Sequence, residues 1–141
     1  MNVDIANEYK SRVYALETKD LIVANPEDRA IIIAINDAFL MGLIRPVLVG
    51  NKKKILDLLM DLGISKSGYE IYNAKSKDDA AMMSVKLVSK QESSILMKGQ
   101  LHSRRLLSHV QNKEYGLVED KMLSHIGILY IPSYHKLLFI S

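Results

Sequence analysis

Short runs of consecutive apolar residues, each followed by an amphipathic stretch, constrain the fold of this chain more than any other feature of its sequence. Strands that are apolar on both faces are typical of a sheet covered by helices on both sides. Strands that alternate with helices at this spacing favour parallel crossover connections. We therefore predict an α/β fold with three layers, α/β/α, around a mainly parallel sheet. The predicted strands are residues 20–24, 46–49, 69–72 and 94–97.

Helix signals fill the intervals between the apolar runs. Pro26 suits the first turn of a helix, and the two acidic residues after it lie where the helix dipole favours negative charge. Two further helix starts carry capping residues, Asn51 and the pair Ser76 and Asp79. Predicted helices cover about residues 26–42, 51–63, 76–88 and 103–111, with another amphipathic segment at residues 4–16.

The last two apolar runs, residues 124–131 and 136–140, are joined too closely for a crossover connection. We therefore predict a C-terminal antiparallel hairpin. No repeat, low-complexity stretch or long linker interrupts the sequence, so we expect a single α/β domain over residues 1–141.

Composition excludes several classes of function. The chain has no cysteine, which excludes a disulfide scaffold and a thiolate metal site and agrees with a cytoplasmic protein. No apolar run reaches the length of a membrane span, and the amino terminus lacks a signal-peptide core, so we expect no membrane association. The 19 basic residues lie among 16 acidic ones, and only seven tyrosines and two phenylalanines could stack on bases, which argues against nucleic acid binding.

Ligands of open α/β sheets bind beyond the carboxyl ends of the strands, near helix N-termini. Four predicted loops lie there, at residues 25–28, 50–51, 73–76 and 98–103. The fourth loop is chemically the richest. Lys98 offers a positive charge, Gly99 permits a ligand to approach the backbone closely, and Ser103 can cap the helix and donate to a phosphate oxygen. The alternative is an ordinary strand-to-helix turn, and the spacing is not that of a P-loop.

Other candidate residues allow a structural interpretation as well as a functional one. The four histidines are not spaced like metal ligands, so we predict no metal site. Lys52–Lys54 form either the solvated first turn of a helix or a contact with an anionic substrate tail. Arg104 and Arg105 are either outward-facing helix residues or phosphate contacts. The histidines are His102, His109, His125 and His135.

Four ordered blocks of sequence carry a resemblance to a known family: residues 96–99 (LMKG), 112–117 (NKEYGL), 123–126 (LSHI) and 137–141 (LLFIS). They resemble the signature of the phosphate acetyl/butyryltransferases, and the phosphate butyryltransferase branch most of all. Residues 46–50 (PVLVG) are similar to an early strand of the same family, so the resemblance covers essentially the whole chain.

The resemblance implies transfer of a short acyl group between coenzyme A and inorganic phosphate, with an acyl phosphate as product. It implies no metal and no cofactor beyond these substrates. Family members fold as two α/β domains, like isocitrate and isopropylmalate dehydrogenases, with the substrates in the cleft between them, and they form dimers or larger assemblies. It assigns no catalytic residue here. By position, the substrate-binding residues would be Lys98, Gly99, His102, Ser103, Asn112 and Lys113, with Ser124 nearby.

The sequence ends where the family continues into a second domain with its catalytic serine and aspartate region. We therefore expect the truncated N-terminal part of a two-domain acyltransferase, with weak or no activity by itself. The family carries arginines at the positions of Ser108 and Val118, and one is more typical near Lys136. Arg105 or His109 is a candidate substitute. The alternative function is a binding, regulatory or subunit-assembly module derived from the same family.

Overall fold

The computed structural model describes residue 12 and residues 16–118, 122–131, 133–134 and 136–141. The chain divides into two compact units, one of residues 18–119 and one of residues 1–17 with 120–141. The single domain predicted over residues 1–141 stays a prediction. Within the described residues, no helix combines the length and the apolar character needed to cross a membrane.

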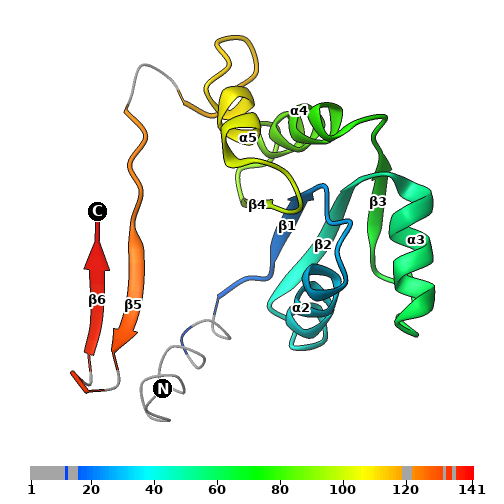
Figure 1. Cartoon of the computed structure of the whole chain (residues 1–141), viewed down its shortest axis with the longest axis horizontal. Coiled ribbons are helices and arrows are strands. Elements are labelled where there is room, and N and C mark those ends of the chain that lie inside the picture. Colours follow the sequence, from blue (N-terminus) through cyan, green and yellow to red (C-terminus); the bar gives the residue numbers. More distant parts are fainter. Residues whose placement is uncertain (1–11, 13–15, 119–121, 132, 135) are drawn as a thin grey trace. The chain divides into compact units, whose positions relative to one another are not determined.

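The unit of residues 18–119 is built on a parallel sheet with the strand order β3-β2-β1-β4 (Figure 1). The strands are β1 (Lys19–Ala24), β2 (Ile44–Gly50), β3 (Glu70–Asn73) and β4 (Ser94–Lys98). The helices are α2 (Arg29–Leu40), α3 (Lys52–Asp61), α4 (Lys77–Val88) and α5 (Ser103–Val110). The predicted parallel sheet is confirmed, and each predicted strand overlaps an observed one.

Helices cover both faces of this sheet (Figure 1). Neighbouring residues of a strand point to opposite faces, so each strand packs against helices on both sides. Val23 of β1 packs in the cluster formed with α2 and α3. Ile22 and Ala24, on either side of it, pack in the clusters formed with α4 and α5. The α2–α3 cluster also contains Ile32, Ile35, Ile44, Leu48, Ile55 and Leu59. The three-layer arrangement of this unit agrees with the sequence prediction.

The order in which the chain adds strands reverses between β1 and β4, although all four strands are parallel. From β1 the chain proceeds outward through β2 to β3, and α4 then returns it to β4 on the other side of β1. Such a reversal leaves a crevice at the carboxyl ends of the two strands, because the connections on its two sides diverge. The carboxyl ends of β1 and β4 are therefore the expected place for a ligand.

Asn25 joins the carboxyl ends of three strands. Its N–H donates to the Val49 carbonyl in β2, and its own carbonyl accepts from the N–H of Gln100, just after β4, both at 2.7 Å. Its side-chain Nδ2 donates to the Gln100 carbonyl at 3.0 Å. Asn25 is buried and has a φ of 58°, a left-handed conformation that asparagine adopts more readily than most residues.

Gly99 lets the backbone after β4 cross close to the backbone after β1. Its N–H donates to the Ala24 carbonyl at 2.9 Å. A Cβ at this position would lie 2.3 Å from the Asn25 carbonyl oxygen and 2.6 Å from that of Ala24. The crossing therefore requires glycine unless the main chain moves.

Helix α2 begins later than the sequence predicts. Asp28 is its N-cap, and Oδ1 accepts from the N–H groups of Ala30 (2.9 Å) and Ile31 (3.2 Å). Pro26 lies in the preceding turn, where its carbonyl accepts from the Asp28 N–H at 2.8 Å. The prediction that Pro26 occupies the first helical turn is wrong, because aspartate is a strong N-cap and the left-handed turn at Asn25 delays the helix.

The second unit contains an antiparallel pair, β5 (Gly127–Ile131) and β6 (Lys136–Ile140), with Gly127 opposite Ile140. The predicted hairpin is confirmed, although its first strand begins at residue 127 rather than 124. The helix predicted over residues 4–16 lies largely outside the described residues, and so do Pro132 and His135 of the hairpin connection.

We expect Gly99→Ala to lower the free energy of unfolding by about 1–3 kcal/mol, because the added methyl group must displace main-chain atoms. Urea denaturation followed by circular dichroism measures this change. Gly50→Ala, at the end of β2, is the control, because its Cβ would meet only side-chain atoms, the nearest being Ile55 Cδ1 at 3.3 Å. Equal stability of Gly99→Ala and the wild type would contradict the close crossing.

Ser84 inside α4 and Ser76 at its N-cap should respond differently to substitution by alanine. Ser84 Oγ is buried and has no hydrogen-bond partner within the described part of the chain. We expect Ser84→Ala to leave stability unchanged or to raise it by about 1 kcal/mol. Ser76 Oγ caps the helix by accepting from the Asp79 N–H at 3.1 Å, so Ser76→Ala should cost about 1 kcal/mol. Denaturation midpoints distinguish the two, and a large loss for Ser84→Ala would count against its unpaired state.

Candidate functional site

A hollow of about 450 Å³ lies at the reversal of the sheet, and we term it the switch-point pocket. Its walls come from three places at the carboxyl edge of the sheet: the start of α2, the start of α4, and the loop from β4 to α5. The lining residues are Asp28, Ile31, Lys77, Lys98, Gly99, Gln100, Leu101 and His102. The predicted site residues Lys98, Gly99 and His102 are thus brought together here.

Lys98 is the last residue of β4, and its side chain lines the switch-point pocket. Its Nζ donates to the carbonyls of Gly99 (3.3 Å) and Leu101 (3.1 Å), which hold the ammonium group over the loop. Lys77 supplies a second positive charge from the start of α4. The two lysines outnumber the single carboxylate of the lining, that of Asp28, which caps α2, so the pocket has an excess of positive charge.

The main-chain amides of the β4–α5 loop are already used within the protein. The N–H groups of Gly99 and Gln100 donate to carbonyls at the end of β1, and that of Leu101 donates to the Gly99 carbonyl at 3.0 Å. Helix α5 begins at Ser103 after His102, which is its N-cap residue and makes no side-chain cap hydrogen bond. The Arg105 N–H donates to the His102 carbonyl at 3.0 Å, so the donors that the uncapped first turn of α5 offers are the N–H groups of Ser103 and Arg104.

The prediction that Ser103 caps α5 is wrong. Ser103 is the first residue inside the helix, one position beyond the N-cap, where a side-chain oxygen no longer reaches the amides of the first turn in the capping geometry. The close approach that Gly99 permits in this structure is to the main chain of Asn25.

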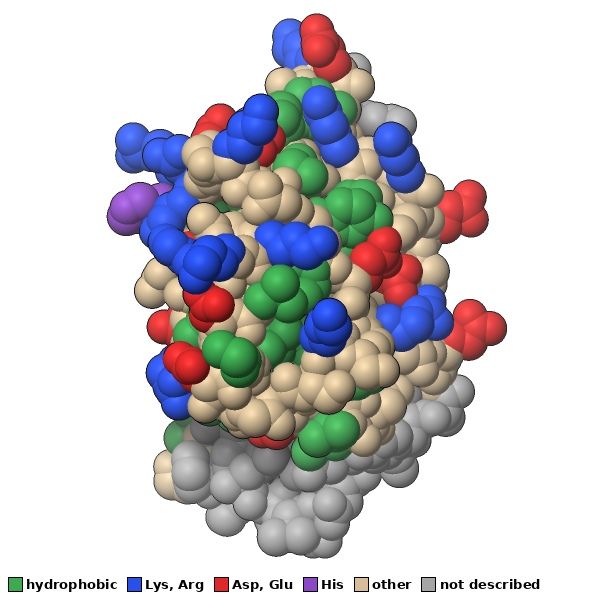
Figure 2. Space-filling model, turned by 90° about the vertical axis from the view of Figure 1, so that its right-hand side faces the viewer, with side chains coloured by type: hydrophobic (Ala, Val, Ile, Leu, Met, Phe, Trp, Pro, Cys, Tyr) green, Lys and Arg blue, Asp and Glu red, His purple; other side chains and the backbone are tan. Residues whose placement is uncertain are grey.

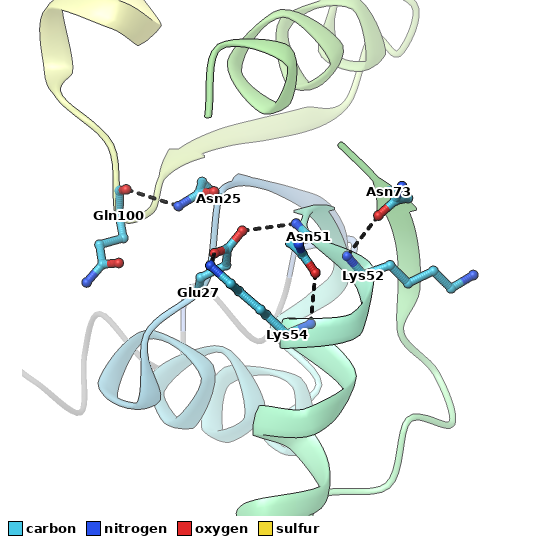
Figure 3. A network of polar contacts seen from close by, with 7 residues as sticks. All are labelled: Asn25, Glu27, Asn51, Lys52, Lys54, Asn73 and Gln100. Carbon is cyan, nitrogen blue, oxygen red and sulfur yellow. Dashed lines mark hydrogen bonds and ion pairs between the residues drawn. The ribbon is translucent and has the colours of Figure 1, made fainter. Parts of the chain in front are cut away.

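The start of α3 is closed by the protein's own side chains (Figure 3). Glu27 Oε1 accepts from the Asn51 N–H at 3.0 Å, and its Oε2 pairs with Lys54 Nζ at 3.2 Å. Asn73 Oδ1 accepts from the Lys52 N–H at 3.0 Å. Asn51 Oδ1 accepts from the Lys54 N–H at 3.0 Å, which confirms the predicted cap. These contacts occupy the N–H groups of Asn51, Lys52 and Lys54 and pair the Lys54 ammonium group with Glu27. Contact of these lysines with an anionic substrate tail stays a prediction.

A second hollow, of about 720 Å³, shares His102 with the switch-point pocket, and we term it the arginine pocket. Arg104 and Arg105 line it from the first turns of α5, with Ser108 one turn further on and Asp78 from α4. Ser108 Oγ donates to the Arg105 carbonyl at 2.8 Å. Both arginines therefore border a hollow, and Arg105 lies beside the serine that stands where the resemblance implies an arginine.

His109 is held by groups of the protein. Its Nε2 lies 3.2 Å from Asp78 Oδ1, and its Nδ1 lies 2.7 Å from the Tyr115 hydroxyl. Lys86 Nζ lies 4.6 Å from the centroid of the Tyr115 ring, which adds a cation–π contact on the same surface. Of the two candidate substitutes for the missing arginine, Arg105 lines the arginine pocket and His109 does not. In the described part of the chain, no group of three or more acidic or histidine side chains could hold a metal ion.

Asn112 and Lys113 lie beyond the other end of α5, where they line a third hollow of about 500 Å³. Asn112 Oδ1 accepts from the N–H groups of Glu114 (2.9 Å) and Tyr115 (3.3 Å), so its side chain closes the turn after the helix. Ser124 belongs to the second unit, shortly before β5. A single cleft lined by all the predicted site residues stays a prediction.

Sequence reasoning placed Asn25 in a candidate loop but did not foresee the role of its side chain, and it missed Lys77 and Asp78. A signal existed in each case: Asn25 precedes a proline at a strand end, and Lys77 and Asp78 open the helix that returns the chain to the sheet. What the sequence did not reveal is the pairing of β1 with β4, which brings these distant residues to one place.

Basic side chains are dispersed over the face that carries α3 and β3. Figure 2 views the molecule from the right-hand side of Figure 1, and its Lys and Arg side chains alternate with acidic and hydrophobic ones. A nucleic-acid-binding surface gathers its basic residues in a contiguous patch or stripe. This face does not show that arrangement.

Known proteins match this chain over most of its length. A phosphate butyryltransferase of Clostridium beijerinckii is 33% identical over 135 residues, which are 96% of this chain and 45% of that protein. A phosphate acetyltransferase of Rickettsia typhi is 32% identical over 114 residues, which are 81% of this chain and 33% of that protein. The chain thus spans less than half the length of these relatives. No family model matches the sequence.

Solved structures show the same fold at low sequence identity. A phosphotransacetylase from Streptococcus pyogenes is 15% identical, with a TM-score of 0.72 over 99% of this chain and 51% of its own. A branched-chain phosphotransacylase from Enterococcus faecalis is 16% identical, with a TM-score of 0.70 over 86% of this chain and 42% of its own. Sequence identity along nearly the whole chain shows that it corresponds to the N-terminal part of the phosphate acetyl- and butyryltransferases, and the solved structures share its fold.

Proposed function

We propose that this chain supplies one anion-binding wall of a phosphate acyltransferase, which transfers a short acyl group between coenzyme A and inorganic phosphate. The switch-point pocket is the observation that carries the proposal. Lys77 and Lys98 line it from two different elements, at the reversal of the sheet where ligands of α/β proteins bind. Both proposed substrates carry phosphate groups, so the charge of the pocket suits either.

In the proposed reaction, an oxygen of hydrogen phosphate attacks the carbonyl carbon of the acyl thioester. The new C–O bond gives the acyl phosphate, the C–S bond breaks, and the proton of hydrogen phosphate ends on the thiolate of coenzyme A. The attack brings two anionic reactants together, which like-charge repulsion opposes. Lys98 and the first-turn donors of α5 would offset this repulsion by holding the phosphate in a fixed position.

The remainder of the proposed site lies outside this pocket. We propose a cleft between this α/β unit and a second α/β domain, as in isocitrate and isopropylmalate dehydrogenases, with Ser103, Asn112, Lys113 and Ser124 along it. A homo-oligomeric, cytoplasmic assembly that uses no metal or other cofactor completes the proposal. The chain spans less than half the length of its relatives, and one wall cannot hold both reactants at reacting distance.

A binding or regulatory module of the same family is the second candidate. Ser108 favours it, because this residue lines the arginine pocket where the resemblance implies an arginine, and its hydroxyl is bonded to the protein's own backbone. A serine cannot make the two parallel hydrogen bonds that a guanidinium makes with phosphate.

We expect this chain by itself to convert butyryl-coenzyme A and phosphate at a rate near the uncatalysed background, because one wall of a cleft does not fix both reactants. Thiol release detected with a chromogenic disulfide measures the rate. Robust turnover would show that the described pocket, or residues near it, complete an active site without a second domain.

We expect Lys98→Gln to weaken binding of coenzyme A about tenfold, because a hydrogen bond to a charged group is lost. Isothermal titration calorimetry measures the affinity. Lys66→Gln is the matched control, because it removes the same charge from an exposed residue in the loop between α3 and β3, at the other end of α3. Identical affinities for the two variants would remove the support for the switch-point pocket.

A further inference from the structure

The arginine pocket contains an acidic side chain that the proposed reaction does not use. Asp78, from the first turn of α4, lines this hollow together with His102, Arg104 and Arg105. Its side chain is 59% exposed, so a structural role in the interior does not account for it. A carboxylate on the wall of a basic pocket lowers the attraction of that pocket for anions.

Asp78 makes its contact with one of the two arginines. Its Oδ1 lies 3.6 Å from Arg105 Nη1 and 3.2 Å from His109 Nε2. The Arg105 side chain is 45% exposed, and an ion pair in such a setting is held weakly. The guanidinium of Arg105 is thus paired by a contact that a stronger anion can replace.

The acid in the neighbouring pocket is different. Asp28 uses Oδ1 to accept two N–H groups at the start of α2, so its charge is committed to the fold. Asp78 instead pairs with a guanidinium, the group that binds phosphate most specifically. A phosphate dianion carries more charge and more acceptor oxygens than a carboxylate, so it can replace Asp78 at Arg105.

We infer that Asp78 is an internal competitor for Arg105, which it holds when the pocket is empty and releases to a ligand that carries phosphate groups. The inference rests on the proposed function and deepens it, because it assigns Arg105 to a phosphomonoester or diphosphate group of the substrate. Asp78 is a positioning residue that acts through Arg105. The same Oδ1 also contacts His109, which itself touches Tyr115, and this second contact joins α4 to α5.

The test uses pyrophosphate as the probe and Asp78→Asn as the variant, with binding measured by calorimetry at low and at physiological salt. Asparagine keeps the shape of the side chain and an acceptor for His109, but it removes the competing charge. We expect Asp78→Asn to bind pyrophosphate about two- to fivefold more tightly than the wild type, with the larger gain at low salt. Thermal unfolding followed by circular dichroism verifies that the variant is folded.

Two further variants separate competition at Arg105 from a general change of charge. Asp57→Asn removes one negative charge from the surface pair with Lys53 on α3, whose residues do not line the arginine pocket. It should leave pyrophosphate affinity near that of the wild type. In an Arg105→Gln background, the gain from Asp78→Asn should be much smaller, because only the direct repulsion between Asp78 and the anion remains to be removed.

The inference is overturned if Asp78→Asn binds pyrophosphate no better than Asp57→Asn, if it binds more weakly than the wild type, or if its gain is as large without Arg105 as with it. These outcomes are distinct from failure of the proposed function. That failure appears as coenzyme A binding that does not depend on Lys98, whatever Asp78 does.

Discussion

The hydrogen bonds around Asn25 hold together the sheet edge on which the candidate site is built. They tie β1 to β2 through Val49 and β1 to the chain after β4 through Gln100. Lys98 and His102 each lie two residues from Gln100 in the chain. The hydrogen bonds between Gln100 and Asn25 therefore fix the position of the main chain from which both side chains extend. Backbone contacts therefore position the pocket, and substitutions such as those of Lys98 or His102 leave these main-chain hydrogen bonds in place.

The protein's own acceptors determine which helix starts remain suited to an anion. Asp28 caps α2, Glu27 and Asn73 accept from the first amides of α3, and Ser76 caps α4. Helix α5 differs, because His102 makes no side-chain cap and the neighbouring side chains are mainly basic. Among these four helices, α5 is therefore the one whose start has no side-chain acceptor on its amides.

Much of the fold of the described residues could be predicted, because apolar runs and capping residues act over a few neighbouring positions. The strands, the Asn51 cap and the hairpin all follow from such local signals. Errors arose where two local signals competed, as when Pro26 and Asp28 both marked the start of α2. The site was harder, because the use of the Gly99 and Gln100 amides, and the approach of Asp78 to Arg105, depend on segments far apart in the sequence.

Strand β4 is an edge strand of the described sheet, since it pairs there with β1 only. Ile95 in this strand is 48% exposed, so apolar burial secures it less than it secures the central strands. Edges of this kind open locally at a lower free energy than the core. Because Lys98 ends β4 while Lys77 belongs to α4, a ligand that contacts both suppresses fraying of the edge. The protection of β4 from local opening should therefore increase with the fraction of pockets that hold such a ligand, and a measurement of this protection reports ligand binding.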